Sequence, residues 1–286
     1  METPEQAAQR IFGERSAFYA ASTVHKDPTV LRRVIELAAP RPDARALDVA
    51  TGSGHTAAAL APNLANVVCV DITRQMLAQA EKMALELGIH NMNLCLANAD
   101  SLPFYDNAFD IVTCRRAPHH FSDIMEALLE MRRVLRSVGR LVIDDRSVPE
   151  DDFVDSCMNE LDRLHDESHV REYRPSRWRQ LLEKCGFTVD LIEPYSRQLP
   201  LTSLTADVSP KNTERIHDIV NGLSQLQRKA MNVTDIGGEV YLNHWYVILL
   251  AHPTTSKDSS YVPRLRQAPK TAASQPQRSL QGRSLF

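Results

Sequence analysis

Short apolar runs alternate with amphipathic segments along the middle of the chain. Five such runs have the length of buried strands: 46–50, 66–71, 92–98, 109–114 and 140–145. Between them, residues 73–87 and 124–135 repeat apolar positions at i, i+4, i+7 and i+11, which predicts helices that each present one apolar stripe. Near-continuous apolar strands that alternate with helices are typical of parallel strands covered on both faces. The pattern therefore predicts an open, doubly wound α/β sheet.

The flanking segments complete the predicted architecture. Residues 187–195 and 244–252 have the composition of two further strands, which gives a mostly parallel, seven-stranded sheet. Residues 1–40 and 151–184 have helical patterns and interrupt the alternation. We therefore expect an N-terminal helical lid over 1–40, one domain over 41–252, and a helical substrate insertion at 151–184, after the fifth strand.

Charge is distributed unevenly along the chain. The 33 Lys and Arg residues against 36 Asp and Glu give a net charge of −3, which excludes a strongly basic nucleic-acid protein and an acidic disordered chain. Residues 253–286 hold six basic residues against Asp258 alone, so this tail carries +5 and residues 1–252 carry −8. The tail has few large apolar residues, and we expect it to be a disordered, solvated end instead of an RNA or membrane tether.

Compartment and partners follow from what the sequence lacks. No run approaches the roughly 20 apolar residues of a membrane span, and the N-terminus has no basic start followed by an apolar block. The five cysteines form no CxxC pair, so neither a disulfide framework nor a thiolate zinc site is predicted. We expect a cytoplasmic monomer or homodimer that acts on a small molecule and binds neither nucleic acid nor metal.

A small-residue turn follows the first predicted strand, where ligands bind in doubly wound sheets. Gly52-x-Gly54 opens the next helix, and Asp71 comes 19 residues after Gly52 at the end of the second strand. This arrangement suits a cofactor with a ribose, either NAD or S-adenosylmethionine. Asp48 would repel the pyrophosphate of NAD and attract the sulfonium and ammonium of S-adenosylmethionine. The alternative for Asp48 is that it caps the turn through backbone amides.

Four segments carry a family resemblance. ALDVATGSGHTAAALAP, VVCVD, ADSLPFYDNAFDIVTCRRAPHHF and LRSVGRLVIDD resemble the class I S-adenosylmethionine-dependent methyltransferases, and in particular the ubiquinone/menaquinone-biosynthesis-like (methyltransferase type 11) group. SLPF at 101–104 followed by NAFD at 107–110 is the most specific marker. The resemblance covers roughly residues 10–252 and implies a Rossmann-like enzyme that transfers a methyl group from S-adenosylmethionine to a small organic acceptor. C-methylation of an aromatic, quinone-like or natural-product substrate is what the analogy suggests.

The resemblance also implies which residues hold the cofactor. Asp71 would accept hydrogen bonds from the ribose hydroxyls, and Ile72 would pack on the adenine. The full set is Asp48, Ala50, Thr51, Gly52, Gly54, Asp71, Ile72, Met76, Asn98, Ala99, Arg115 and Tyr19. Ala50 stands where many members have glycine, a mild change that we expect to need only negative φ. Asn98 stands where many have aspartate, so an amide oxygen would receive the adenine amino group.

Catalytic and substrate residues are predicted above the strand ends. His119 and His120 follow the fourth strand, where a histidine can act as general base near neutral pH; alternatively, one of them only hydrogen-bonds backbone or substrate. The predicted substrate contacts are Glu160, His169, Arg171, Tyr173 and His25. Tyr19, Ser22 and His25 share one helical face that either covers the cofactor or packs on the body of the protein with Tyr19 in the core. The stretch HDESH at 165–169 resembles an Arg-Asp-Pro-Ser-His stretch of uncharacterised relatives but lacks its arginine and proline.

Two other functions use the same features. An NAD(P)-dependent oxidoreductase fits the sheet and the glycine turn. A regulatory protein that binds S-adenosylmethionine without turnover fits the cofactor residues. The sequence does not separate C-, N- and O-methylation, because the acceptor pocket is built from segments that vary around the shared fold.

Overall fold

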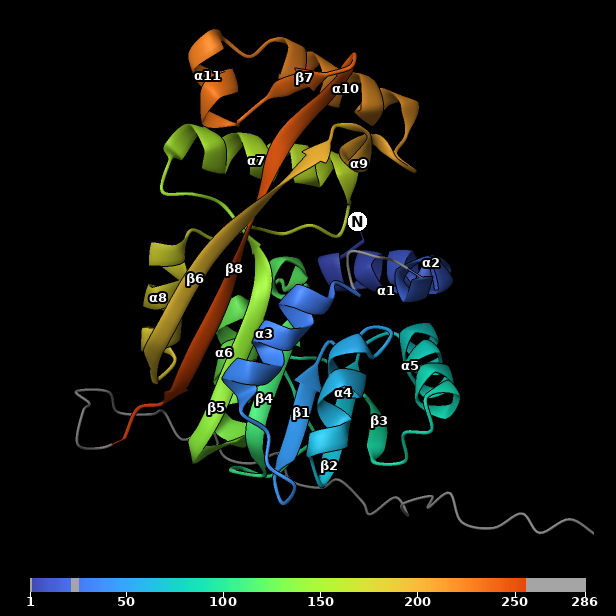
Figure 1. Ribbon diagram of the computed structural model, residues 1–286, viewed down its shortest axis with the longest axis vertical. Coiled ribbons are helices and arrows are strands. Elements are labelled where there is room, and N and C mark those ends of the chain that lie inside the picture. The colour runs from blue at the N-terminus through green and yellow to red at the C-terminus, as the bar shows by residue number, and fades with distance from the viewer. Residues whose placement is uncertain (1, 22–25, 256–286) are drawn as a thin grey trace, which may run out of the picture.

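The computed structural model describes residues 2–21 and 26–255 and contains a central sheet with the strand order β3-β2-β1-β4-β5-β8-β6 (Figure 1). The strands are β1 (Arg45–Val49), β2 (Asn66–Asp71), β3 (Met92–Leu96), β4 (Phe109–Arg115), β5 (Leu135–Ser147), β6 (Phe187–Pro200), β7 (Thr234–Ile236) and β8 (Glu239–Pro253). Strands β1 to β5 pair in parallel, and β8 runs antiparallel between β5 and β6. The predicted doubly wound, mostly parallel sheet is confirmed; the short β7, paired with β8, is an eighth strand that the pattern did not predict.

Helices cover both faces of the sheet, as the apolar strands require. The helices α3 (Pro28–Ala38), α4 (His55–Leu60) and α5 (Arg74–Glu86) lie on one face, with the short 3-10 helix η1 (Ala61–Asn63) after α4. The helices α6 (Ile124–Val134) and α8 (Pro175–Lys184) lie on the other. Val34 and Leu60 belong to one buried core, whereas Leu128 and Trp178 belong to the second. The sheet is therefore held between two apolar layers.

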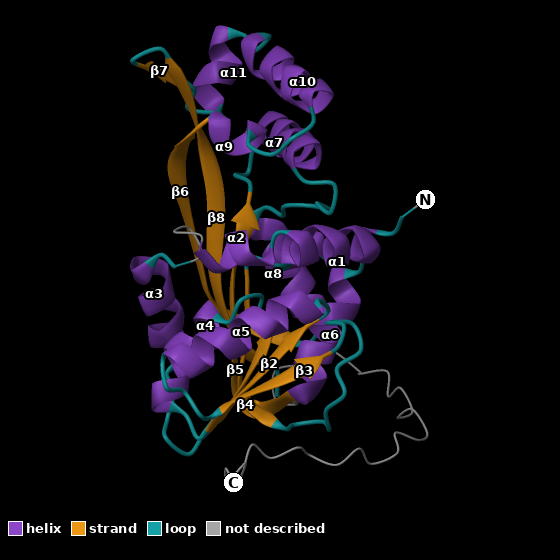
Figure 2. Ribbon diagram, turned by 90° about the vertical axis from the view of Figure 1, so that its right-hand side faces the viewer, coloured by secondary structure: helices purple, strands orange, loops and turns teal. Residues whose placement is uncertain are grey.

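A separate helical unit packs against one side of the far ends of β6 and β8 (Figures 1 and 2). It contains α7 (Asp152–His165), α9 (Thr202–Thr205), α10 (Pro210–Asn221) and α11 (Gln225–Ala230). Met158, Ile216 and Leu242 are fully buried in its own apolar core. Residues 151–184 thus form two helices with different neighbours: α7 belongs to this unit, and α8 packs against β6 beside the sheet. The loop 166–174 joins them.

The N-terminal helices α1 (Pro4–Glu14) and α2 (Ser16–Ala21) lie between the main sheet and the helical unit (Figure 1). Thr3 caps α1, and Gln6 completes the capping box. The Gln9 side chain donates to the carbonyl of Ile72 at 3.2 Å, which ties α1 to the loop after β2. Ser22, His25 and the tail from 256 onward lie outside the described residues, so their predicted roles stay predictions. No helix in the described ranges is long and apolar enough to cross a membrane.

Candidate active site

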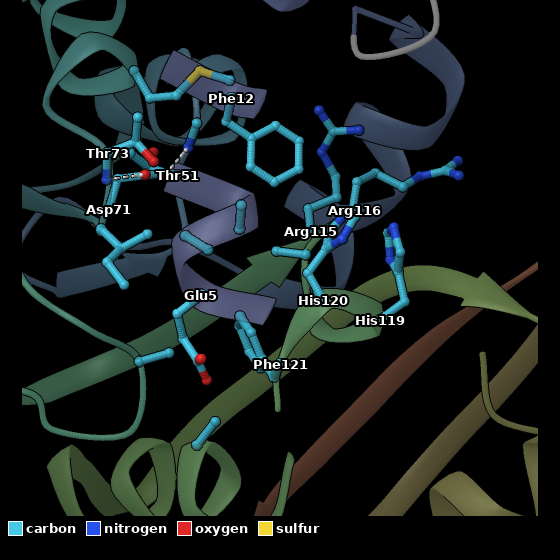
Figure 3. A pocket seen from close by; sticks show the side chains of 18 of the residues that line it. Glu5, Phe12, Thr51, Asp71, Thr73, Arg115, Arg116, His119, His120 and Phe121 are labelled. Carbon is cyan, nitrogen blue, oxygen red and sulfur yellow. Dashed lines mark hydrogen bonds between the residues drawn. The ribbon is translucent and has the colours of Figure 1, made fainter. Parts of the chain in front are cut away.

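A cavity of about 280 Å³ opens at the carboxyl ends of β1, β2 and β4 (Figure 3). Parallel strands place these ends at one edge of the sheet, which is where doubly wound folds bind ligands. The turn after β1, the start of α5 and the loop after β4 form its walls. Helix α1 contributes Glu5, Ala8 and Phe12, and the segment after β5 contributes Asp162, His165 and His169. The cavity therefore brings together segments that lie far apart along the chain.

Most residues predicted to hold the cofactor line this cavity. The lining members are Asp48, Ala50, Thr51, Gly52, Asp71, Ile72, Met76, Asn98, Ala99, Arg115 and Tyr19. Gly54 is not among them. Its φ is +88°, and a Cβ built on it would lie 2.9 Å from the Cβ of Ala80. Gly54 therefore allows α4 and α5 to approach closely, outside the lining of the cavity.

The turn after β1 differs from the expectation at two positions. Ala50 has a φ of +51°, so the predicted negative φ is wrong. The turn needs a left-handed residue there, which glycine adopts readily and alanine adopts with strain. Asp48 is buried, and its carboxylate accepts hydrogen bonds from the hydroxyls of Thr51 at 2.5 Å and Thr113 at 2.6 Å. Asp48 therefore fixes the turn through hydroxyl groups, and burial raises its pKa.

Asp71 is held rigidly at the end of β2. One carboxylate oxygen accepts the backbone N–H of Gly52 at 2.8 Å, and the other accepts that of Thr73 at 2.8 Å (Figure 3). Each carboxylate oxygen has a second acceptor position, so Asp71 can still bind two hydroxyl groups from the cavity. Burial raises its pKa, while the two amide hydrogen bonds favour the ionised form.

The two predicted catalytic histidines both line the cavity from the short helix η2 (Pro118–His120) (Figure 3). His119 Nδ1 lies 2.6 Å from Oδ1 of Asp145, and both side chains are buried. Burial raises the pKa of Asp145 to about 7 and lowers that of His119. His120 Nδ1 faces Ser168 instead, at 3.0 Å from Oγ. Asp145 is a functional candidate that the sequence reasoning missed, although two aspartates at the end of a buried strand were a visible signal.

Two adjacent arginines follow β4. Arg115 Nε donates to the hydroxyl of Thr56 at 2.9 Å. Arg116, which was not predicted, donates to Asp144 at 3.1 Å and to the Tyr195 hydroxyl at 2.9 Å. Its guanidinium carbon lies 3.7 Å from the centre of the Tyr246 ring, a cation–π geometry. These contacts fix the wall of the cavity beside His119 (Figure 3).

Only one of the predicted substrate residues in the described ranges lines the cavity. His169 does so, and its Nε2 lies 3.2 Å from Oδ1 of Asn159. Burial lowers the pKa of His169 to about 3. Glu160, Arg171 and Tyr173 do not line the cavity: they contact Arg215, Asp155 and Trp178, respectively. Glu160 is exposed on α7, where its place on the helix turns it away from the face that carries Asp162.

A buried ionic cluster around Arg146 lies next to these histidines and was also missed. Arg146 Nη2 lies 2.6 Å from each carboxylate oxygen of Asp162, and Nε donates to Glu172. His244 Nδ1 is 3.2 Å from the same Nη2. The cluster joins β5, α7, the loop 166–174 and β8, so no local pattern could have revealed it. Among the described residues, no group of three or more His, Cys, Asp or Glu side chains is arranged to hold a metal ion.

Known methyltransferases are similar to this chain in sequence. A family profile described as a methyltransferase domain matches residues 47–143. An uncharacterized methyltransferase, YcgJ, from Bacillus subtilis is 40% identical over 170 residues, which cover 59% of this chain and 67% of that protein. The ubiquinone/menaquinone biosynthesis C-methyltransferase UbiE from Shewanella frigidimarina is 36% identical over 127 residues, covering 43% of this chain and 51% of that protein.

Solved structures extend the similarity to the whole fold. The crystal structure of YcgJ has a TM-score of 0.75 and 31% identity, covering 80% of this chain and 99% of that chain. The crystal structure of a putative methyltransferase from Bacillus halodurans has a TM-score of 0.76 and 28% identity, covering 79% of this chain and 100% of that chain. The fold and the site thus define a Rossmann-like methyltransferase. The chain belongs to the class I S-adenosylmethionine-dependent methyltransferases and is an enzyme of that class.

Proposed function

We propose that this protein transfers the methyl group of S-adenosylmethionine to a small organic acceptor within the cavity at the strand ends. The observation that carries the proposal is the Asp71 carboxylate, which two backbone amides hold in place at the cavity wall. Its remaining acceptor positions suit the two hydroxyls of a ribose. The left-handed Gly52 beside it leaves open space for a ligand to approach the backbone, since no atom lies within 4 Å of a Cβ built there.

The proposed cofactor contacts follow the order of the strands. Ile72 and Met76 would hold the adenine, with Asn98, Ala99 and Arg115 at its edge and the neighbouring wall. The turn after β1 would hold the methionine half, and Tyr19 would cover the cofactor from α2. All of these residues line the same cavity, which supports a single continuous cofactor site.

When bound, S-adenosylmethionine supplies a methyl carbon whose bond to sulfur breaks, with the electron pair passing to sulfur, as the acceptor forms its new bond to that carbon. His119 accepts the proton that the acceptor loses, through Nε2. Once Asp145 is ionised, it positions the imidazole by accepting Nδ1–H across the 2.6 Å separation, which leaves the lone pair on Nε2. His120 lies beside it, with ring centres 4.0 Å apart, and we assign it to acceptor contact.

The segments around the cavity serve to exclude water and to hold the acceptor. Of the predicted 1–40 lid, we propose that α1 and α2 cover the cavity, since α1 lies over the strand ends and Ser122 donates to its Glu5, whereas α3 packs in the core on a face of the sheet. We propose that the helical insertion supplies the acceptor wall through Asp162, His165 and His169. Holding both reactants in line accounts for a large part of the rate enhancement in reactions of this type.

Calorimetry with S-adenosylhomocysteine tests the cofactor site. The wild type should bind it, and Asp71→Ala should abolish the binding because the ribose loses its two acceptors. Asp43→Ala, which removes an exposed carboxylate far from the cavity, is the matched control and should bind normally. Unchanged affinity in Asp71→Ala would refute the ribose assignment. Quenching of NADH fluorescence without affinity for S-adenosylhomocysteine would instead support an oxidoreductase, and binding without turnover of any acceptor would support a regulatory protein.

A further inference from the structure

One wall of the cavity is polar throughout. All the residues that the chain from β5 onward contributes to it have polar side chains: Arg146, Asp162, His165, Asp166, His169 and Tyr246. Together with His119 and His120, this wall places four imidazole rings around one space, with the rings of His119 and His169 5.9 Å apart. Because each imidazole has two distinct nitrogens, the contacts of each ring decide what it offers to a ligand.

The contacts of His120 determine its tautomer. Its Nδ1 lies 3.2 Å from the carbonyl oxygen of Ser168 and 3.0 Å from the Ser168 hydroxyl oxygen. That hydroxyl donates its own proton to Asp166 at 2.6 Å, so it can only accept from His120. Both partners of Nδ1 are therefore acceptors, and Nδ1 must carry the proton. In the neutral ring the lone pair is therefore on Nε2, which has no hydrogen-bond partner among residues 2–21 and 26–255.

The same reasoning applies to His165 and His169. His165 Nδ1 donates to the carbonyl oxygen of Leu204 at 3.1 Å, which leaves the lone pair on Nε2. His169 Nε2 faces Oδ1 of Asn159 at 3.2 Å, and that oxygen also accepts the backbone N–H of Glu172 at 2.8 Å. His169 therefore donates through Nε2 and has its lone pair on Nδ1. Neither lone pair has a partner within the described part of the chain.

A donor from the protein completes this polar wall. Arg146 uses Nε for Glu172 and Nη2 for Asp162 and His244, whereas its Nη1 has no hydrogen-bond partner in the described ranges. Its side chain is 18% exposed and lines the cavity. The wall therefore presents several nitrogen lone pairs and one guanidinium edge. A complementary ligand carries several O–H donors and one oxygen that accepts from the guanidinium.

We propose that the methyl acceptor is a compact polyhydroxylated molecule with a carboxylate or carbonyl oxygen, and not a hydroquinone with a long prenyl chain. This inference rests on the proposed methyl transfer and specifies the substrate class of the same site. A prenyl chain placed along this wall would leave imidazole and guanidinium groups without hydrogen bonds, and buried polar groups without partners destabilise a complex. O–H donors satisfy the same groups.

The test uses the full-length protein saturated with S-adenosylhomocysteine, so that loss of the cofactor site is detected first and separately. The probes are 3,4,5-trihydroxybenzoate, its trimethoxy counterpart, myo-inositol and a prenylated hydroquinone, each added in a thermal-shift assay and then in calorimetry. We expect trihydroxybenzoate to raise the melting temperature and to bind at least tenfold more tightly than the trimethoxy compound, which has the same ring and charge but no phenolic donors. Binding of the prenylated hydroquinone alone, or binding of none of the hydroxylated probes, would overturn the proposal while leaving the cofactor site intact.

Two variants localise the effect. His165→Phe removes one lone pair at similar size and should weaken trihydroxybenzoate binding about tenfold, the usual effect of one hydrogen bond. His217→Phe, at an exposed position on α10, is the matched control and should bind like the wild type. Affinity for S-adenosylhomocysteine is measured for both variants and should be unchanged, which shows that they are folded. Equal affinity of His165→Phe and wild type for trihydroxybenzoate would contradict the assignment of this wall.

Discussion

Replacing Asp145 with asparagine separates the chemical role of this residue from its effect on stability. Asp145 lies at the carboxyl half of β5, is fully buried, and has Oδ1 2.6 Å from His119 Nδ1. Its second carboxylate oxygen, Oδ2, is buried without a hydrogen-bond partner among the described residues. A buried carboxylate in this setting is poorly solvated, and burial raises its pKa from 3.8 to about 7.

The raised pKa gives the sign and size of the stability effect. Because the folded protein holds the Asp145 proton more tightly than the unfolded chain, the free energy of unfolding falls as the pH rises from near 3.8 through about 7. A difference of about 3 pKa units corresponds to about 4 kcal/mol at pH 8. An asparagine side chain cannot ionise, so Asp145→Asn should be the more stable protein at pH 8 by up to this amount, and its advantage should shrink toward pH 5.

Urea unfolding of both proteins at pH 5, 6, 7 and 8 measures this difference. Comparing the two proteins at each pH isolates the contribution of Asp145 and of His119, which is paired with it, from that of more distant groups. A difference between Asp145→Asn and wild type that is the same at all four pH values would refute the reasoning. It would mean that Asp145 is already ionised at pH 5.

Three further predictions concern the dyad and the turns. The methyl-transfer rate of the wild type should rise with pH through about 7, because Asp145 then loses its proton and His119 Nε2 gains a lone pair. The Asp145→Asn variant should be slow and should lack this rise. The same pH–rate profile in both proteins would exclude a role for the His119–Asp145 pair. In urea unfolding, Gly54→Ala should lower the free energy of unfolding by about 1 to 3 kcal/mol more than Gly88→Ala. Both glycines have positive φ, but only a Cβ on Gly54 would meet a neighbouring atom, at 2.9 Å. Equal losses in the two variants would count against close packing at Gly54. In the same assay, Ala50→Gly should stabilise the protein by about 1 kcal/mol, because glycine adopts the left-handed conformation of this turn without strain. The control Ala58→Gly, within α4, should destabilise the protein by a similar amount. A lower free energy of unfolding in Ala50→Gly would contradict strain at this turn.

The sequence determined the parts of this protein that rest on local periodicity and local turns. The alternation of apolar runs with helical stripes is a property of neighbouring residues, and it was sufficient for the doubly wound sheet and the strand preceding the Gly52 turn. The closeness of Asp71 and Gly52 in space could also be predicted, because parallel neighbouring strands bring their carboxyl ends together at one edge of the sheet. Even at this turn the predicted sign of φ at Ala50 was wrong. The backbone N–H of Thr51 donates to the carbonyl of Val70 on the neighbouring strand, and this tertiary contact constrains the path of the turn.

Only the tertiary structure decided the acceptor side of the cavity. The pairing of His119 with Asp145 joins residues 26 positions apart, and the Arg146 cluster draws on β5, α7 and β8. Glu160 and Asp162 are two positions apart on one helix, yet only Asp162 faces the cavity. Sequence patterns report which face of an element is apolar, whereas the partner of a buried polar group is set by which distant segments pack together. The polar, buried residues to which we assign the chemistry are therefore the ones that the sequence alone specified least.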